Sequence, residues 1–352
     1  MEPITVHASR CYEVNIGAGL LTTAGKAISA VCSGKTAVIV SDDTVYALYG
    51  AALEAQLTKA GIQTDRFVFL HGEQSKNLST YGALLNFLCE KRVSRGDFLV
   101  ALGGGVVGDL AGFAAATYQR GISFVQIPTT LLAAVDSSVG GKTGIDLDGG
   151  KNQVGAFYQP SLVLCDTDTF ATLPEAEYRN GCAEIIKYAM LGSKDLFAQL
   201  GKLPVNKNYA AVIRACVEMK RDFVERDERD LGCRMLLNFG HTVGHAVETC
   251  SDYQIPHGQG VAIGMAVMTK AACSLGLCEK DTEPALVSLL QAYKLPTETD
   301  VPLQDLAAVM ATDKKRSGNT LQLVVPTQIG SCELHTVEKE AIPTWLQAGG
   351  VK

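Results

Sequence analysis

The sequence predicts an α/β protein with two domains: an N-terminal domain built on a parallel, Rossmann-like sheet, and a C-terminal domain that is all helical. Three observations predict this arrangement. Short β-branched strands alternate with helices up to about residue 166, the strand pattern then fades, and long helical stretches follow. A chain of 352 residues also has room for about two domains. We place the boundary between residues 166 and 173, which gives domains 1–170 and 171–352, and expect a site between them.

The elements of the first domain follow in chain order. The expected strands are "TAVIVSDD", "DRFVFL", "DFLVAL", "SFVQIP" and "SLVLCD", and the expected helices between them are 45–60, 78–91 and 110–116. This alternation implies a parallel sheet that is covered on both faces. The polar, glycine-rich stretch "GGKTGIDLDGGKNQVGAF" (140–157) interrupts it and predicts a hairpin or flap.

The second domain shows helical periodicity in five stretches, which are 175–191, 210–226, 238–250, 261–275 and 283–293. Apolar residues make up 47% of the chain and charged residues 19%, as in a globular enzyme. The charge of −6 argues against a general nucleic-acid binder, and no stretch is suited to cross a membrane. Eleven cysteines without regular spacing, and no apparent export signal, lead us to expect reduced thiols in the cytoplasm.

A glycine-rich turn follows the third expected strand. In "DFLVALGGGVVGDLAGFAAA", Gly103, Gly105 and Gly108 stand in GxGxxG register between a strand and a helix. Such a turn lets the backbone approach a pyrophosphate at a helix N-terminus, although a tight turn without a ligand would look the same. The acidic residue expected at the end of the next strand is missing. We therefore expect a variant nucleotide site, with Asp42 or Glu73 holding the ribose.

Three of the six histidines fall within seventeen residues: His241, His245 and His257. The first two belong to "LNFGHTVGHAVE" and are one helical turn apart, as in many metal sites. The glutamate of an HExxH zinc-protease motif is absent, and spacing does not decide which histidines bind. Glu184, in the apolar stretch "NGCAEIIKYAM", is the best carboxylate candidate, although it could simply pair with Lys187 on its own helix.

Cationic side chains gather in glycine-rich turns and beside the histidines of this acidic chain. Each could be an ordinary surface charge, but together they favour an anionic small substrate. Metal, nucleotide and anion sites in one chain predict redox chemistry on a phosphorylated or carboxylated sugar. The cationic residues are Arg120, Lys142, Lys151, Lys220, Arg234, Lys314, Lys315 and Arg316, and the neutral amides Asn152 and Asn238 lie among them.

Long blocks of the sequence resemble the 3-dehydroquinate synthase family, which acts in the shikimate pathway to chorismate and the aromatic amino acids. They occur in family order from about residue 10 to 345, and they are "GGGVVGDLAGF", "YQRGISFVQIPTTLLAAVDSSVGGKTGID", "GKNQVGAFYQP", "TLPEAEYRNGCAEIIKYA", "DERDLGCRMLLNFGHTVGHAVE" and "HGQGVAIGM". The resemblance implies an NAD- and metal-dependent lyase that converts 3-deoxy-D-arabino-heptulosonate 7-phosphate into 3-dehydroquinate and phosphate. The metal would be zinc or cobalt.

The resemblance also implies a role for individual residues. Glu184, His241 and His257 would bind the metal, and Asp136 and Lys187 would hold the substrate hydroxyls. Lys220 and Arg234 would bind the substrate carboxylate, and Arg120 would reach the partner subunit of a homodimer. The residues implied for the phosphate are Lys142, Asn152, Asn238, His245 and a lysine of "DKKR", Lys314 or Lys315, with Lys151 in the same pocket. The residues implied for NAD are Asp42, Glu73, Lys76, Gly104, Gly105, Val106, Asp109, Thr129, Thr130, Lys142, Lys151, Thr172, Leu173 and Glu177.

Three alternatives stay open at this stage. One is a related sugar-phosphate cyclase that makes an inosose or a valiolone, one is a metal-dependent alcohol or glycerol dehydrogenase that releases NADH, and one is a non-catalytic sugar-phosphate sensor. Gln259 departs from the glutamate usual in the family after "HG". We hypothesise that this neutral neighbour weakens metal binding or changes its preference.

Overall fold

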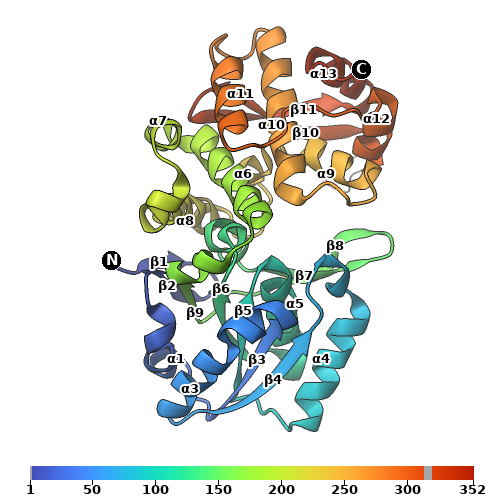
Figure 1. Ribbon diagram of the computed structural model, residues 1–352. Helices are drawn as coiled ribbons and strands as arrows, with labels where there is room; N and C mark the ends of the chain where they lie inside the picture. Colours follow the sequence, from blue (N-terminus) through green and yellow to red (C-terminus); the bar gives the residue numbers. More distant parts are fainter. Residues whose placement is uncertain (1, 313–318) are drawn as a thin grey trace. The chain divides into compact units, whose positions relative to one another are not determined.

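The computed structural model describes residues 2–312 and 319–352, so Lys314, Lys315 and Arg316 lie outside the described residues. The chain forms two compact units (Figure 1). Unit 1 comprises Met1–Pro174 and Cys216–Arg229, and unit 2 comprises Glu175–Ala215 and Asp230–Lys352. The chain passes from one unit to the other at 174/175, 215/216 and 229/230, and the second of these points lies within the helix α8 (Tyr209–Arg226). The sequence had led us to expect residues 216–229 in the second domain, whereas they group with unit 1.

Unit 1 contains a seven-stranded sheet in the order β1-β2-β9-β6-β5-β3-β4. All neighbouring strands are parallel except the edge strand β1, which pairs antiparallel with β2. The parallel sheet confirms the predicted fold class. The strands are β1 (Ile4–His7), β2 (Cys11–Gly17), β3 (Thr36–Asp42), β4 (Gln63–Phe69), β5 (Phe98–Gly103), β6 (Ser123–Pro128) and β9 (Leu162–Asp166).

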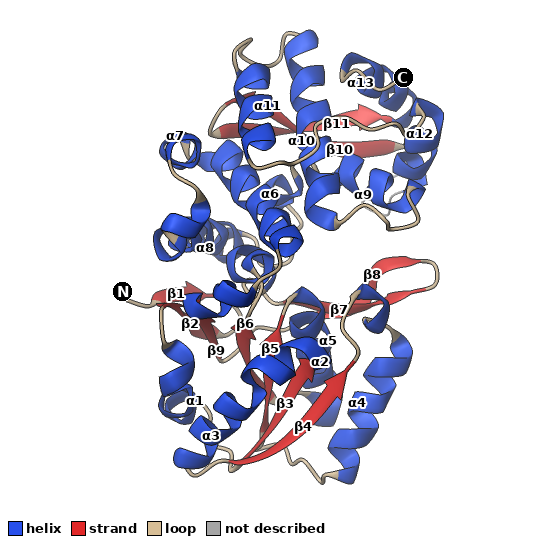
Figure 2. Ribbon diagram, viewed as in Figure 1, coloured by secondary structure: helices blue, strands red, loops and turns tan. Residues whose placement is uncertain are grey.

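Helices cover both faces of this sheet (Figure 2), because successive residues of its central strands are apolar and point to opposite faces. Ala37 and Ile39 of β3 pack with the helices α1 (Ala24–Val31) and α3 (Ala51–Lys59). Val38 and Val40 pack on the other face with α4 (Leu78–Glu90) and α5 (Gly105–Thr117). A short α2 (Asp43–Val45) and the π-helical turn Tyr46–Gly50 lead into α3.

The glycine-rich stretch after β6 forms an antiparallel hairpin of β7 (Lys142–Leu147) and β8 (Gly150–Phe157). This confirms the hairpin that its composition predicted. Gly144 and Gly155 face one another across it, and a Cβ on Gly155 would lie 2.1 Å from the carbonyl oxygen of Thr143. The close approach of the two strands therefore requires glycine.

Unit 2 consists mainly of helices, as expected, but it is not all helical. It also contains an antiparallel hairpin of β10 (Thr320–Gln328) and β11 (Ser331–Glu338). Leu321, Leu323 and Val325 are buried at the two-residue period of a strand, a signal that the sequence analysis overlooked. The helices are α6 (Glu175–Gly192), α7 (Lys194–Lys202), α8, α9 (His241–Cys250), α10 (His257–Ser274), α11 (Thr282–Ala292), α12 (Leu303–Thr312) and α13 (Ile342–Ala348).

Two helix starts in unit 2 differ from the prediction in a way that concerns the histidines. The expected helix 238–250 begins at His241, after a 3-10 segment (Cys233–Asn238) and a left-handed Gly240. The expected helix 261–275 begins earlier, at His257, because Pro256 provides its extended N-cap. Both histidines are therefore the first residues of helices. Within the described ranges, no helix combines the length and apolar character needed to span a bilayer.

Candidate metal centre and nucleotide site

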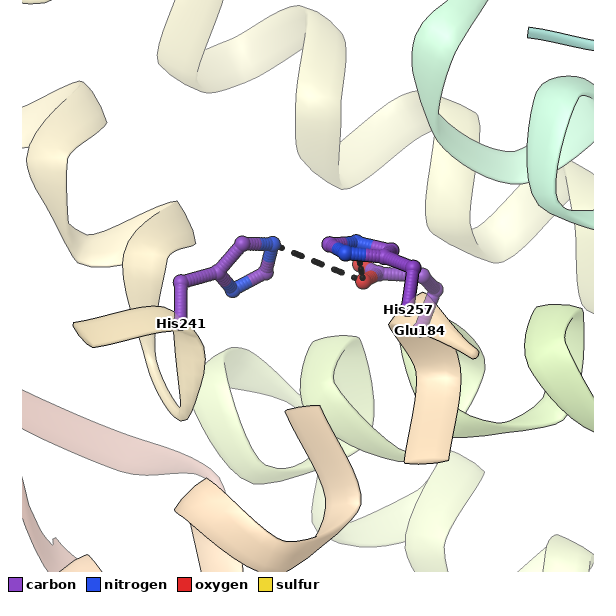
Figure 3. Close-up of side chains that lie close together, drawn as sticks. All are labelled: Glu184, His241 and His257. Carbon is purple, nitrogen blue, oxygen red and sulfur yellow. Dashed lines mark ion pairs between the residues drawn. The ribbon is translucent and has the colours of Figure 1, made fainter. Parts of the chain in front are cut away.

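Three side chains from three helices of unit 2 converge on one point (Figure 3). Glu184 lies in the middle of α6, and its Oε1 is 3.5 Å from Nε2 of His241 and 3.3 Å from Nε2 of His257. Glu184 has no exposed surface. A carboxylate and two imidazoles with one ligand atom each at this spacing form a group that could hold a metal ion, and three protein ligands are typical of catalytic zinc sites.

Glycines allow these three helices to come close enough for the side chains to meet. A Cβ on Gly264 of α10 would lie 1.9 Å from the carbonyl oxygen of Gly240, next to His241. A Cβ on Gly258 of α10 would lie 2.5 Å from backbone atoms of Asn180 in α6. Because a backbone cannot move aside as a flexible side chain can, larger residues here would separate the helices.

The other ring nitrogen, Nδ1, of both His241 and His257 faces a hydrogen-bond acceptor. Nδ1 of His241 is 3.1 Å from the carbonyl oxygen of Phe239, and Nδ1 of His257 is 2.9 Å from Oε1 of Glu248. An oxygen that only accepts requires Nδ1 to donate. When such a ring is neutral, its lone pair is on Nε2, the nitrogen nearer to Glu184, and this is the tautomer that binds a metal. The donor set therefore fits a divalent cation.

Charges around the cluster are strong and buried. Nζ of Lys187, one turn along α6, lies 2.5 Å from Oε2 of Glu184, and both side chains are buried. Burial lowers the pKa of His241 well below its usual value, against the attraction of Glu184. Burial also acts to lower the pKa of His257, but Glu184 and Glu248 outweigh it and raise that pKa to about 10. The Glu184–Lys187 helix pair is thus present, but Glu184 also faces two histidines.

Further candidate residues of unit 2 lie near the same helices. His245 follows His241 by one turn, and the two rings meet edge to face at 5.3 Å between centroids. Arg234 and Asn238 belong to the 3-10 segment that leads to α9; the Arg234 side chain is buried, and Nδ2 of Asn238 donates to the carbonyl of Met235. Glu177 lies in the first turn of α6 and accepts from Asn180.

In unit 1, the candidate nucleotide site lies at the carboxyl ends of three adjacent strands. Asp42 ends β3, Gly104 follows β5, and Thr129 follows β6. This edge of an open parallel sheet is where nucleotides bind in doubly wound folds. The Asp42 carboxylate caps α2 by accepting from the amide of Val45, and burial raises its pKa.

Two features of this edge suit a bound nucleotide. The hydroxyl oxygen of Thr129 is buried and has no hydrogen-bond partner among the residues that the structure describes. A Cβ on Gly104 would lie 2.9 Å from the side chain of Thr130, and one on Gly105 would lie 3.2 Å from the hydroxyl of Ser137, so larger side chains would fill the turn. An available hydroxyl beside a bare backbone turn at the start of α5 fits a pyrophosphate ligand.

A buried lysine joins this edge to the β7–β8 hairpin. Nζ of Lys76 lies 2.5 Å from Oδ2 of Asp109 on α5 and 2.6 Å from Oδ1 of Asn152 in β8. Burial alone would lower the pKa of Lys76, but the carboxylates of Asp109 and Glu73 outweigh it, and the pKa is raised. Asn152 adopts a left-handed backbone conformation with φ 53°, and its backbone N–H donates to Oδ1 of Asp146. Predicted cofactor and phosphate residues are therefore in direct contact.

A second lysine of unit 1 pairs with another predicted substrate residue. Nζ of Lys220, from the part of α8 that belongs to unit 1, donates to the backbone oxygen of Asp136 at 2.7 Å and to its Oδ1 at 2.6 Å. The structure thus brings together Asp136 and Lys220, which were expected to contact different groups of the substrate.

The remaining predicted residues of unit 1 occupy several places. Lys142 begins β7 and is exposed, Lys151 lies in β8, and Val106 packs from α5 against the sheet core. The hydroxyl of Thr172 contacts that of Tyr49 at 2.5 Å, and Leu173 ends the segment Thr167–Thr172. Arg120 is exposed at the end of Tyr118–Arg120 and has a left-handed backbone with φ 65°.

Sequence reasoning gave no role to Glu248, although it ends the quoted histidine stretch. It is buried, and its position three residues after His245 on α9 is the signal that could have identified it. Gln259, which we expected to influence the metal, lines a groove with Ile255, Ile263 and residues 296–301. The carboxylate that contacts Nδ1 of His257 is that of Glu248.

The fold and the site define a class of protein: a parallel α/β unit with a nucleotide-binding edge, and a helical unit with a Glu-His-His metal cluster. Comparisons with known proteins specify the family. The models of the N-terminal and C-terminal parts of 3-dehydroquinate synthase match residues 66–180 and 181–316. The chain belongs to the 3-dehydroquinate synthase family.

Individual relatives agree with this assignment. The chain is 43% identical over 345 residues to the 3-dehydroquinate synthase of Enterococcus faecalis OG1RF, covering 96% of both chains. It is 41% identical to that of Clostridium acetobutylicum, again over 96% of both.

Among solved structures, the 2-epi-5-epi-valiolone synthase ValA from Streptomyces hygroscopicus subsp. jinggangensis 5008, with NAD+ and Zn2+ bound, matches with a TM-score of 0.88 and 27% identity over 99% of both chains. A 2-deoxy-scyllo-inosose synthase complexed with carbaglucose-6-phosphate, NAD+ and Co2+ matches with a TM-score of 0.85 and 25% identity over 97% of this chain and 100% of that one.

Proposed function

We propose that this chain is a 3-dehydroquinate synthase, an NAD- and metal-dependent lyase. It converts 3-deoxy-D-arabino-heptulosonate 7-phosphate into 3-dehydroquinate and phosphate by oxidation, phosphate elimination, reduction and intramolecular aldol closure. The observation that carries the proposal is the convergence of Glu184, His241 and His257 in a chain that is 43% identical to 3-dehydroquinate synthases over 96% of its length. The geometry of the cluster supports a metal, and the relatives support the substrate.

The proposed metal ligands are Glu184, His241 and His257, with zinc or cobalt as the ion. When bound, the metal polarises a substrate hydroxyl, and NAD accepts a hydride from the substrate and returns it within each turnover. Lys187 forms an ion pair with one oxygen of Glu184 and leaves the other oxygen facing the histidines. We propose that the Lys187 ammonium also donates to a substrate hydroxyl.

The remaining charged groups would bind and orient the substrate. Asp136 would accept from a hydroxyl, and Lys220 and Arg234 would bind the carboxylate, for which a guanidinium is well suited. Because Lys220 is paired with Asp136 in this structure, an incoming carboxylate would compete for its ammonium. The proposed phosphate ligands are Lys142, Asn152, Asn238 and His245, with Lys151 in the same pocket and Lys314 or Lys315 outside the described residues.

The strand ends of unit 1 would hold NAD. We propose that Asp42 and Glu73 bind the ribose and that Lys76 and Asp109 lie beside the nicotinamide half, while the turn at Gly104–Gly105 receives the pyrophosphate. The other proposed NAD contacts are Val106, Thr129, Thr130, Lys142, Lys151, Thr172, Leu173 and Glu177.

We also propose that the enzyme is a cytoplasmic homodimer in which Arg120 reaches the partner's site. One observation favours the role of Arg120: its side chain is exposed in the segment Tyr118–Arg120 that follows α5. Light scattering of the protein in solution measures the subunit number directly.

The decisive experiment supplies 3-deoxy-D-arabino-heptulosonate 7-phosphate and NAD, and follows phosphate release and absorbance at 340 nm in parallel. We expect phosphate without lasting NADH, and loss of phosphate release after chelation, because NAD is restored in every cycle. Stoichiometric NADH without phosphate would instead indicate a dehydrogenase. If protein shown to bind metal and NAD produces neither phosphate nor NADH, its substrate is that of another sugar-phosphate cyclase.

A further inference from the structure

Glu248 is a buried carboxylate that lies beside the metal cluster without belonging to its three ligands. Only 1% of its surface is exposed, and its Oε1 is 2.9 Å from Nδ1 of His257. The two residues come from different helices, α9 and α10, and are nine positions apart. Burying a carboxylate is unfavourable unless charged or hydrogen-bonding groups compensate, so this position calls for an explanation.

The backbone around Glu248 is shaped to accommodate its side chain. A Cβ on Gly260, one turn after His257, would lie 3.2 Å from Cγ and 3.3 Å from Oε1 of Glu248. The carboxylate is also within 4.8 Å of a ring nitrogen of His245. Glu248 therefore lies between the proposed metal ligand His257 and the proposed phosphate ligand His245.

We propose that Glu248 is a positioning residue for the metal, an inference that rests on the proposed function. Its carboxylate accepts the Nδ1 proton of His257, which fixes the ring so that Nε2 points to Oε1 of Glu184. It also increases the electron density on Nε2 and so strengthens that nitrogen as a ligand. Because the same carboxylate reaches His245, it ties the metal side of the site to the phosphate side.

The two ligand histidines are held in different ways. His241 donates to a neutral backbone carbonyl, that of Phe239, which no side-chain substitution removes. His257 donates to the side-chain carboxyl group of Glu248, which a single substitution can replace or delete. Substitution of Glu248 therefore tests the orientation of one ligand while the other two keep their partners.

The experiment measures zinc affinity by competition with a chromophoric chelator, together with the visible absorption spectrum of the Co2+-loaded protein. We expect Glu248→Ala to weaken zinc binding about 10- to 100-fold, the range typical for loss of such a partner. Glu248→Gln keeps an acceptor of the same shape but removes the charge, and we expect a loss of about tenfold. Both substitutions should change the intensity of the Co2+ bands, which report ligand geometry. Exposed Glu279 in the same unit provides the matched control, and Glu279→Gln should leave both readouts unchanged.

Folded Glu248→Gln protein that binds zinc within twofold of the wild type, with an unchanged Co2+ spectrum, would overturn the proposal. If Glu248→Ala fails to fold, as judged by its thermal melt, the proposal is tested with Glu248→Gln alone. Wild-type protein that binds no zinc would overturn both this inference and the metal site. Wild-type protein that binds zinc but releases no phosphate would overturn only the proposed reaction, because zinc affinity is measured without substrate.

Discussion

The two units of the chain use lysine–carboxylate pairs in different ways. In unit 2, Lys187 and Glu184 are 1% and 0% exposed and lie on the same helix, three residues apart. In unit 1, Lys76 pairs with Asp109 and Lys220 with Asp136, each time across different elements and with the carboxylate partly exposed. Both members of the pair in unit 2 are enclosed by packing, whereas in unit 1 only the lysine of each pair is buried and its carboxylate partner is partly exposed.

This difference teaches how each unit is prepared for its own ligand. Tightly packed helices fix the metal cluster, so its ligands need little rearrangement when a cation binds. The buried lysines of unit 1 are paired with partly exposed carboxylates of the protein itself, and an anionic ligand must compete with these. We therefore expect packing changes to damage the metal cluster most, and charge changes to act mainly on cofactor binding in unit 1.

The largest effect is expected from Gly264→Ala. The added Cβ would lie 1.9 Å from the carbonyl oxygen of Gly240, so α9 and α10 must separate, and His241 moves away from Glu184. Urea denaturation should show a loss of about 1–3 kcal/mol, and zinc affinity should fall with it. Gly201, on α7 of the same unit, has open space around its Cβ position and serves as the control. Gly201→Ala should be neutral or stabilising by up to about 1 kcal/mol. Equal stability of the two variants would contradict this account.

An intermediate effect is expected from Lys76→Met in unit 1. Removing the ammonium leaves Asp109 without this buried cation, and we expect NAD to bind about tenfold more weakly, or about 1.4 kcal/mol, in isothermal titration calorimetry. Zinc affinity should stay the same, because the metal cluster lies in unit 2. Lys91, which pairs with Asp65 in a more exposed position of unit 1, is the matched control. A Lys91→Met variant that weakens NAD binding equally would rule out a specific role for Lys76.

The smallest effect is expected from Gln259→Glu. Because Gln259 lines a groove with Ile255 and Ile263, we expect its new charge to change the zinc dissociation constant by less than about twofold. Chelator competition under the conditions used for Glu248→Gln provides the comparison. An affinity gain of tenfold or more would restore the hypothesis that the neutral residue at position 259 limits metal binding.

Much of the fold could be predicted from the sequence, because patterns within short segments determine which segments form strands, helices and turns. Alternating strands and helices indicated the parallel sheet, and the glycine turn after "DFLVAL" indicated the strand edge where Asp42, Gly104 and Thr129 now lie together. The hairpins β1–β2 and β10–β11 were missed. The strand β1 has only four residues at the sheet edge, and the longer β10–β11 pair follows a series of helices, where alternating apolar residues are easily mistaken for loop or helix.

The sequence by itself determined the class of fold, the density of histidines, and the presence of a carboxylate in an apolar helix. The spacing of His241, His245 and His257 left open which of them face Glu184, and family resemblance alone suggested a choice. Only the tertiary structure decided the convergence at Glu184 and placed Glu248 behind His257. The physical reason is that helical periodicity fixes which residues share a face, whereas the neighbour of that face depends on backbone contacts between distant glycines, such as Gly240 and Gly264.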